Sequence, residues 1–543
     1  MAGTVHQVFS ASAARFPARP FLHVPASSCL GYHSGPIEIS YADMAARVAA
    51  LAAIYAAAGY GTGHRVAVAL ANRPAFFEHW LALNSLGTSV VPVNAEQRPS
   101  EIAWQLEHSE SSLLVCLPGL LPLVAESLAL MQNPPAQMPS DATSAPAAAT
   151  RASHAAPGPG TECALLYTSG STGKPKGCIL PNDYFTRFGE WYAGIGGLCT
   201  LRHGEERLIT PLPLSHMNAM ATSAMGMMET GGCIVQLDRF HPSAWWDAVR
   251  SSGATVVHYL GVMPAILLGM DPSPADELSA QVRFGFGAGV NPRHHAPFET
   301  RFGFPLIEAW AMTETGCGGC IIANHEPRHV GSSCFGKPSA AVEYRMVDEQ
   351  GADVTSGEPG ELLVRASGAE PRAGFFAGYL KNPEATEEAW TGGWLHTGDV
   401  VRQAADGSMH FVDRRKNVIR RSGENIAALE VEAALADAPE VAQLVVTAVE
   451  DDIRGEEVMA CVVLRPGVAA DATTARAIQT RAQQQLVYFK APGYVSFVTE
   501  IPRTASQKPQ RGEIRKLAPS WRASDACFDL REHKRRPHAV MPT

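Results

Sequence analysis

Residues 167–177 read YTSGSTGKPKG, with three glycines, two lysines and five hydroxylated residues, counting the tyrosine. Glycines let backbone N–H groups approach an anion, while hydroxyl and ammonium groups add donors and positive charge. These groups come from Thr168, Ser169, Ser171, Thr172, Lys174 and Lys176. A serine- and glycine-rich surface turn is the plain alternative. The density of donors favours a loop that holds phosphate.

The spacing of this loop excludes the commonest phosphate loop. A Walker A loop requires G-x-x-x-x-G-K-[ST] ahead of a helix. Here only two residues separate Gly170 from Gly173, and Pro175 follows Lys174, so no hydroxyl stands there to bind magnesium. The sequence therefore does not predict a P-loop NTPase.

The segments around the loop predict an α/β fold. The apolar run ECALLYT, residues 162–168, predicts a buried strand that leads directly into the glycine-rich loop, where α/β folds bind ligands. Upstream, helix and strand patterns alternate. Ser40 and Asp43 have capping-box spacing at the start of a helix over residues 40–59, and an apolar strand follows at 64–70. This alternation predicts mainly parallel sheets wrapped by helices.

Composition limits the class of protein. The chain has 543 residues, 46% of them hydrophobic and 18% charged, with a net charge of −9, which argues against broad nucleic-acid binding. We find no signal-peptide core and no apolar run long enough to span a membrane. The eleven cysteines are scattered, so we expect a reduced, cytoplasmic protein without a disulfide framework. We interpret Cys317 and Cys320 as structural or pocket-lining thiols, with a metal or redox pair as the alternative.

The loop resembles the phosphate loop of the adenylate-forming superfamily, which includes acyl-CoA synthetases, peptide-synthetase adenylation domains and luciferases. Other stretches resemble further motifs of this superfamily, in the same order along the chain. They are PLPLSHMNAM at 211–220, GAG at 287–289, EAWAMTETG at 308–316, GWLHTGD at 393–399, FVDRRKNVIRRSGENI at 411–426 and PRTASQKPQRGEIRK at 502–516. The segment from residue 411 is most similar to the crotonobetaine/carnitine-CoA ligase branch.

The resemblance implies a large N-terminal adenylation domain over residues 1–414 and a small mobile α+β domain over 415–520. We expect residues 521–543 to form a tail, with the basic stretch 531–536 solvated rather than a nucleic-acid or membrane patch. Residues 133–160 are rich in Pro, Ala, Ser and Gly, and we expect an exposed, disordered loop there.

The resemblance also implies ATP, Mg²⁺ and coenzyme A, with a carboxylic acid converted to an acyl-adenylate and then to a thioester. Trp310 corresponds to the aromatic residue that stacks on adenine, and Asp399, with Arg414, to the groups that bind ribose. Thr313 corresponds to the phosphate-binding threonine and Glu314 to the magnesium ligand. The full nucleotide set is Thr168, Ser169, Gly170, Ser171, Thr172, Gly173, Lys174, Lys176, Gly287, Ala288, Gly289, Trp310, Met312, Thr313, Asp399 and Arg414.

Three further roles follow from the resemblance. Lys508 corresponds to the lysine that neutralises charge during adenylation, with a solvated surface lysine as the alternative. Lys416 corresponds to the hinge about which the C-terminal domain rotates. His216 corresponds to a gate residue, although a core or surface histidine is the alternative. The hinge rotation would present Arg420, Ser422, Gly423 and Glu424 for the coenzyme A step.

The sequence leaves the acid and the acceptor open. An acyl-CoA ligase acting on a small or medium acid is the first hypothesis, and enzymes that load a carrier protein or silent nucleotide-binding regulators are the alternatives. We expect a monomer or homodimer that binds no nucleic acid. Candidate acid-pocket segments are residues 258–263, 285–290 and 312–320. A carnitine-like cation would require an aromatic cage, for which Trp191, Tyr192, Trp245 and Trp246 are candidates.

Overall fold

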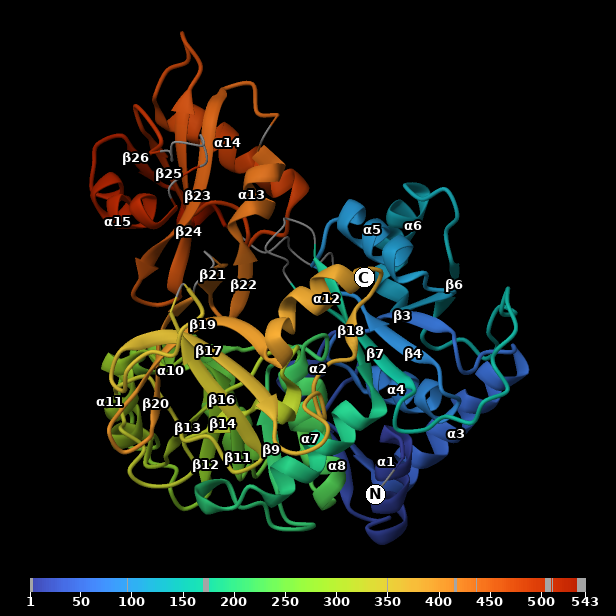
Figure 1. The fold of residues 1–543 in the computed structure, drawn as a ribbon. Coiled ribbons are helices and arrows are strands. Elements are labelled where there is room, and N and C mark those ends of the chain that lie inside the picture. The colour runs from blue at the N-terminus through green and yellow to red at the C-terminus, as the bar shows by residue number, and fades with distance from the viewer. Residues whose placement is uncertain are drawn as a thin grey trace. The chain divides into compact units, whose positions relative to one another are not determined.

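The computed structural model describes residues 3–94, 96–168, 175–348, 350–414, 418–435, 437–502, 509 and 511–534 (Figure 1). The chain forms two compact units. The first comprises Met1–Ala95, Gln105–Leu166 and Gly177–Asp413, and the second comprises Glu96–Trp104, Tyr167–Lys176 and Arg414–Thr543. In the described part of the chain, no helix combines the length and apolarity needed to cross a membrane.

One mainly parallel sheet contains the strand that precedes the glycine-rich loop. Its strand order is β18 (Gly378–Tyr379), β8 (Lys176–Pro181), β7 (Glu162–Thr168), β4 (Ser89–Pro92), β3 (Arg65–Ala69), β5 (Leu113–Cys116) and β6 (Ala136–Pro139). Strands β4, β3 and β5 pair in parallel, and nearly all of their residues are buried. Such continuous burial is typical of strands covered by helices on both faces, so the predicted alternation is confirmed.

A second sheet is parallel except at its two edges. Its strand order is β14 (Ile321–Ile322), β13 (Leu306–Trp310), β12 (Phe284–Ala288), β11 (Val256–Leu260), β9 (Arg207–Thr210), β10 (Cys233–Gln236), β1 (Pro20–Val24) and β2 (Ile37–Ser40). The edge strands β14 and β2 are antiparallel to their neighbours. Because β11, β12 and β13 are parallel, their carboxyl ends meet at one edge of the sheet.

A third sheet follows in the chain and is built from antiparallel pairs. Its strand order is β15 (Cys334–Gly336), β20 (Met409–Arg414), β19 (Leu395–Gln403), β17 (Pro359–Ala366) and β16 (Val342–Val347). Its strands come from the chain between the second sheet and the second unit.

Helices before residue 414 surround these sheets (Figure 1). They are α1 (Val5–Arg15), α2 (Ala26–Cys29), α3 (Tyr41–Ala57), α4 (Pro74–Ser85), α5 (Pro99–Ser109), α6 (Leu121–Ala129), α7 (Asn182–Gly194), α8 (Ala224–Thr230), α9 (Pro242–Ser251), α10 (Val262–Leu268), α11 (Pro292–Phe302) and α12 (Pro383–Ala389), with the short helices η1 (Pro118–Leu120), η2 (Gly197–Cys199), η3 (Asn218–Ser223), η4 (Gly316–Gly319) and η5 (Thr391–Gly393). Helix α3 begins as predicted, because Ser40 Oγ accepts a hydrogen bond from the Asp43 amide at 3.0 Å. Met44, Val48 and Tyr55 on its inner face are fully buried.

The second unit is an α+β structure. Its sheet has the order β22 (Glu424–Ala427), β21 (Val418–Arg421), β24 (Gly455–Leu464), β25 (Tyr494–Phe497) and β26 (Cys527–Asp529), and β23 (Val441–Asp451) also pairs with β24. The helices after residue 414 are α13 (Ala428–Leu435), α14 (Ala472–Gln485), α15 (Arg511–Arg522) and η6 (Arg531–His533).

Two expectations from composition are wrong. Residues 133–160 are not a structureless loop, since β6 pairs with β5, and the amides of Ala148 and Ser153 donate to the carbonyls of Ala58 and Thr62. The small side chains bury little area, but the backbone still finds partners along the α3–β3 connection. Residues 521–543 are not simply a tail either, because β26 adds a strand to the C-terminal sheet and the Lys534 side chain is fully buried.

The buried side chain of Asn182, at the start of α7, connects several of these segments. Its Oδ1 accepts hydrogen bonds from the Val5 amide and from Asn84 Nδ2, and its Nδ2 donates to the carbonyls of Gly158 and Thr161. All of its hydrogen-bonding capacity is therefore used inside the first unit.

Replacing Asn182 with Ala should destabilise the first unit by about 2–4 kcal/mol, because four hydrogen bonds are lost, two of them buried. Urea unfolding followed by tryptophan fluorescence measures this. Asn382→Ala is the matched control, since Asn382 makes a single capping bond to the Ala385 amide and its loss should cost about 1 kcal/mol. Equal losses in the two variants would contradict the connecting role of Asn182.

Candidate active site

Three predicted pocket segments lie side by side at the carboxyl ends of β11, β12 and β13. Tyr259 pairs with Gly287, and Gly287 with Glu308, so the predicted segments 258–263, 285–290 and 312–320 belong to or follow neighbouring strands. A Cβ atom on Gly287 would collide with the Tyr259 carbonyl oxygen, and Gly289 has φ of +79°. Glycine is thus required here by close packing and by backbone conformation.

Glu308 holds the loop that follows β12. Its carboxylate accepts hydrogen bonds from the amides of Gly289 at 2.9 Å and Val290 at 3.2 Å, and from the Tyr259 hydroxyl at 2.8 Å. Burial raises the pKa of Glu308, and these donors oppose that shift. Glu308 had no predicted role, although an acidic residue in the apolar strand PLIEAW was a usable signal.

Trp310 and Asp399, predicted to contact adenine and ribose, are brought together. Trp310 Nε1 donates to Asp399 Oδ2 at 2.9 Å, and the two side chains come from β13 and β19, in different sheets. Both are buried, and the indole ring also packs against Phe335 with centroids 6.0 Å apart. Their adjacency is observed, whereas their contact with a nucleotide stays a prediction.

The loop after β13 carries Thr313 and Glu314. The Tyr379 hydroxyl donates to Glu314 Oε1 at 2.8 Å, and the Tyr184 hydroxyl donates to the Thr313 carbonyl at 3.0 Å. Burial, reinforced by Glu314, raises the pKa of Tyr379, so its hydroxyl remains a donor. Tyr379 was missed in the sequence because it lies 65 positions from its partner.

The loop also positions Met312, whose amide donates to Thr315 Oγ1 at 2.8 Å. No group of three or more His, Cys, Asp or Glu side chains arranged to hold a metal occurs within the described ranges. Glu314 stays the carboxylate predicted to bind magnesium. This suits magnesium bound chiefly through substrate phosphates and water.

Several predicted residues lie outside the described residues. They are Ser169, Gly170, Ser171, Thr172, Gly173, Lys174, Lys416 and Lys508. Their flanks are described: β7 ends at Thr168, β8 begins at Lys176, and β20 ends at Arg414, whose side chain is not described.

His216 is exposed and lies just before the π-helix η3. π-Helical turns are rare and occur often at functional sites. The π-helix ends at Ser223, whose hydroxyl donates to the Asn218 carbonyl and lies 2.7 Å from His258 Nδ1. On the other side of the ring, the Tyr192 hydroxyl lies 2.8 Å from His258 Nε2. These contacts assign the proton to Nδ1, which donates to Ser223, while Nε2 accepts from Tyr192.

The ring of His258 is enclosed. It stacks on Phe286 with centroids 4.9 Å apart, and burial lowers its pKa to about 3. His258 is thus a neutral core histidine beneath the strand ends. The proposed aromatic cage is also divided, because Trp191 and Tyr192 pack near Phe286, whereas Trp245 and Trp246 belong to a separate core with Phe298 and Phe302.

Cys317 and Cys320 are free thiols in the η4 region. Burial raises the pKa of Cys317 to about 12 and that of Cys320 well above its usual value. Both therefore stay protonated, which supports the structural interpretation over a metal or redox pair.

In the second unit, the residues predicted for the coenzyme A step form one hairpin. Strands β21 and β22 pair Arg421 with Glu424, and the intervening Ser422 and Gly423 have φ of +54° and +84°. Positive φ at both positions defines a type I′ turn. Arg420, Ser422, Gly423 and Glu424 are therefore adjacent.

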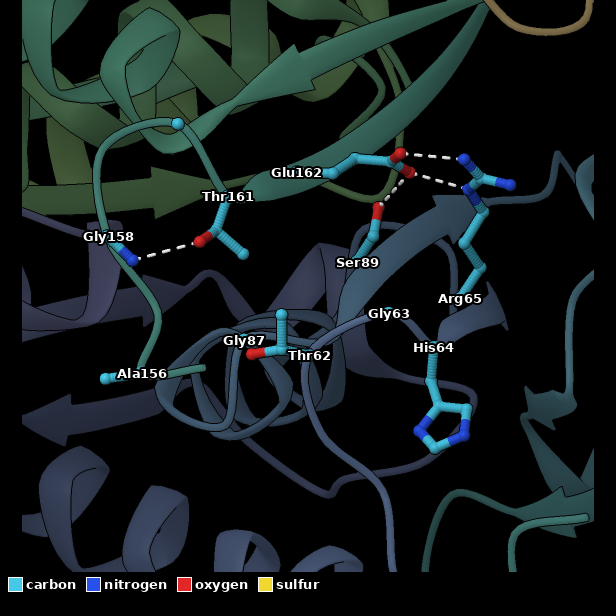
Figure 2. Close-up of a pocket in the computed structure, with 11 residues that line it drawn as sticks. Thr62, Gly63, His64, Arg65, Gly87, Ser89, Ala156, Gly158, Thr161 and Glu162 are labelled. Carbon is cyan, nitrogen blue, oxygen red and sulfur yellow. Dashed lines mark hydrogen bonds and ion pairs between the residues drawn. The ribbon is translucent and has the colours of Figure 1, made fainter. Parts of the chain in front are cut away.

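An open cavity of about 470 Å³ lies elsewhere in the first unit (Figure 2). It borders Arg65, Ser89 and Glu162, the first residues of β3, β4 and β7, so it lies at the amino ends of these strands, whereas Thr168 is at the carboxyl end of β7. As Figure 2 shows, Arg65 and Ser89 both bond to Glu162, at 2.7 and 2.8 Å. With this charge paired internally, we assign the cavity no role in the reaction.

The fold and the loops at the strand ends define an AMP-forming acid–thiol ligase. The chain belongs to the AMP-binding enzyme family: residues 9–380 match the AMP-binding enzyme domain, and residues 430–508 match the AMP-binding enzyme C-terminal domain. The resemblance to the adenylate-forming superfamily is thereby confirmed, and ATP and coenzyme A are substrates of this family.

Known proteins agree with this assignment. The chain is 32% identical to the sulfoacetate–CoA ligase of Cupriavidus necator over 520 residues, which is 94% of this chain and 96% of that protein. It is 29% identical to the crotonobetaine/carnitine–CoA ligase of Citrobacter koseri over 495 residues, 87% of this chain and 92% of the relative. The fold matches o-succinylbenzoate CoA synthetase from Bacillus subtilis with a TM-score of 0.80 at 23% identity, over 94% and 98% of the two chains.

Acid should destabilise the first unit partly through His258. A histidine whose pKa is lower in the folded state binds its proton more readily when unfolded, so stability is complete above pH 6.5 and falls toward pH 3. Relative to His258→Gln, the wild-type free energy of unfolding should fall by about 2 kcal/mol between pH 7.5 and 5. His203→Gln, at an exposed position, is the control. A pH-independent difference between the wild type and His258→Gln would contradict the assignment.

Proposed function

We propose that the protein couples a small or medium carboxylic acid to coenzyme A through an acyl-adenylate. The carboxylate oxygen attacks the α-phosphorus of ATP and pyrophosphate leaves. The thiolate of coenzyme A then attacks the acyl carbon and AMP leaves. The observation that carries this proposal is the hydrogen bond between Trp310 and Asp399. The loop that follows Trp310 contains Glu314, whose carboxylate accepts a hydrogen bond from the Tyr379 hydroxyl.

The first half-reaction would use the first unit's strand-end loops together with Lys508. Asp399 would accept from the ribose hydroxyls, and Trp310, aligned by the same carboxylate, would contact adenine. Thr313 would donate to the α-phosphate. Magnesium held by Glu314 would supply charge neutralisation at the phosphates. Lys508 would stabilise the charge that develops as the carboxylate attacks.

The second half-reaction would use the β21–β22 hairpin. A rotation about Lys416 would remove Lys508 and bring residues 420–424 to the acyl-adenylate. The compact type I′ turn supports this role, because its Ser-Gly tip carries little side-chain bulk. His216, exposed before the π-helix, would control passage between acid and thiol.

The size of the acid is inferred from what fills the edge of the second sheet. His258, Phe286 and Tyr192 occupy the space beneath the ends of β11 and β12, and Gly261 packs directly against Gly289. This favours a compact acid. Of the four aromatic residues predicted for a cage, Trp191 is half-buried and the other three are buried, so Trp191 is the candidate to contact a cationic acid of the carnitine type.

The test is a panel of acids with ATP, Mg²⁺ and coenzyme A. Acetate, butyrate, crotonate, malonate, sulfoacetate and crotonobetaine cover size and charge, and mass spectrometry detects the acyl-CoA and AMP. Acyl-CoA formation with a compact acid would support the proposal. Acid-dependent pyrophosphate exchange without acyl-CoA would indicate a carrier protein as acceptor, and no exchange with any acid would contradict the proposal.

Trp310→Phe should raise the KM for ATP about tenfold, because it keeps a flat ring but removes the N–H that bonds to Asp399. ATP–pyrophosphate exchange measures this. In Asp399→Asn, which loses the ribose acceptor, the same Trp310→Phe change should have little further effect. Additive losses in the double variant would contradict the coupling of the two side chains.

Tyr379→Phe should raise the magnesium concentration needed for half-maximal adenylation about three- to tenfold, because Glu314 loses the donor that orients its carboxylate. Magnesium titrations of pyrophosphate exchange provide the readout. Tyr344→Phe is the matched control, since the Tyr344 hydroxyl contacts Gln403 in the third sheet. Superimposable titrations for wild type and Tyr379→Phe would exclude Tyr379 as the positioning group.

A further inference from the structure

The segment from Cys527 to Lys534 is a structural part of the second unit. Strand β26 pairs antiparallel with β25 (Figure 1), and the Leu530 amide donates to the Gly493 carbonyl at 2.8 Å. Gln479 and Gln483, on α14, donate their side-chain amides to the carbonyls of Leu530 and His533, each at 2.8 Å. The chain is therefore held by its backbone up to Lys534.

Lys534 enters a buried ionic cluster. Its ammonium group bonds to Glu457 Oε1, and Arg421 Nε bonds to Glu457 Oε2 at 2.8 Å. The Lys534 and Glu457 side chains have no exposed area, and that of Arg421 is 3% exposed. Burial lowers the pKa of Lys534 to about 7 while Glu457 opposes that shift. A carboxylate shared by two cations in this way fixes all three side chains.

Arg421 belongs to the β21–β22 hairpin, and the hairpin is docked on the turn between β23 and β24. The Ser422 amide donates to the Arg454 carbonyl at 2.9 Å, and the Arg420 amide donates to Glu456 Oε2 at 2.7 Å. Arg421 also pairs with Gly455 across the strands. Because the hairpin is bonded to this turn, the position of its tip depends on the position of residues 451–457.

The terminal segment also fixes that turn at a second point. Arg531 Nη1 bonds to Asp451 Oδ2 at 2.9 Å, while Asp451 Oδ1 accepts from the amides of Ile453 and Arg454 at 3.0 and 2.8 Å. One end of the turn is thus held by Arg531 and the other by Lys534. Both cations lie in the stretch that the composition alone suggested was solvated.

We propose that Lys534 and Arg531 are positioning residues for the thioester half-reaction, acting through Glu457 and Asp451 to hold the β21–β22 hairpin. This rests on the proposed function, in which residues 420–424 serve the coenzyme A step. Lys534 and Arg531 touch neither the substrate nor the reacting atoms. Their effect is to restrict the hairpin to one orientation, so that the Ser422–Gly423 tip is presented as a rigid element.

The test separates the two half-reactions in Lys534→Met. ATP–pyrophosphate exchange reports adenylation, and single-turnover release of acyl-CoA from preformed acyl-adenylate reports the thioester step. We expect the thioester rate to fall about ten- to a hundredfold, since small misplacements of reacting groups have effects of that size, while exchange changes less than about threefold. Arg531→Gln, at a partly exposed side chain, should cause the same selective loss if Lys534→Met fails to fold.

Arg481→Met is the matched control, because Arg481 lies on α14 outside this cluster, and both rates should stay near wild type. Rates are normalised to the folded fraction, so a purely structural role would leave both normalised rates near wild type. That result in Lys534→Met and Arg531→Gln would overturn the proposal, as would equal losses in the two half-reactions. Gly423→Leu tests the underlying assumption separately. If Gly423→Leu spares the thioester step, the hairpin assignment fails. If Gly423→Leu loses the thioester step while Lys534→Met and Arg531→Gln keep it, only the positioning role is refuted.

Discussion

The hydrogen bond from Trp310 to Asp399 joins two sheets that are otherwise formed by separate parts of the chain. Trp310 ends β13 of the second, mainly parallel sheet, and Asp399 lies in β19 of the antiparallel sheet. A buried carboxylate needs donors, so neither side chain can move without exposing the other to a large desolvation cost. The loop that carries Thr313 and Glu314 begins one residue beyond this bond. Tyr379 holds the same loop further along by donating to the Glu314 carboxylate, and Tyr184 donates to the Thr313 carbonyl between these two points.

Other buried polar side chains also join distant segments of the chain through hydrogen bonds. Asn182 connects α1 and α4 with the segment before β7, His258 connects α7 with the π-helix, and Glu308 orders the loop after β12. Each has partners distant in the sequence and is satisfied on every side that the structure describes. Apolar packing supplies most of the driving force for folding, but it is nearly indifferent to direction. These polar contacts select one arrangement of the strand ends.

The sequence predicted the fold class because the alternation of helix and strand patterns is local, whereas the grouping of the motifs into one site was implied by the resemblance to the superfamily. Helix α3 followed from the Ser40 cap and its apolar face, and β3 and β7 from short apolar runs. Side-chain partners were not predictable in this way. Trp310 and Asp399 are 89 positions apart, and Lys534 and Glu457 are 77 apart, so no local window contains both members of either pair. The basic stretch near the C-terminus was misread for this reason, since its composition is that of a solvated segment and only a distant carboxylate makes burial of its lysine possible.

Burial of Lys534 also bears on how modular these ligases are. An exchange of C-terminal units between relatives appears simple when the unit is taken to end with α15, because the helices and the long β23–β24 hairpin would all be transferred. Such a graft would omit β26 and leave Glu457 facing Arg421 alone, in a site shaped for a second cation. The exchangeable piece is defined by its charge balance rather than by its visible helices and strands. It ends no earlier than residue 534, and a donor sequence lacking a lysine there would need a compensating change at position 457.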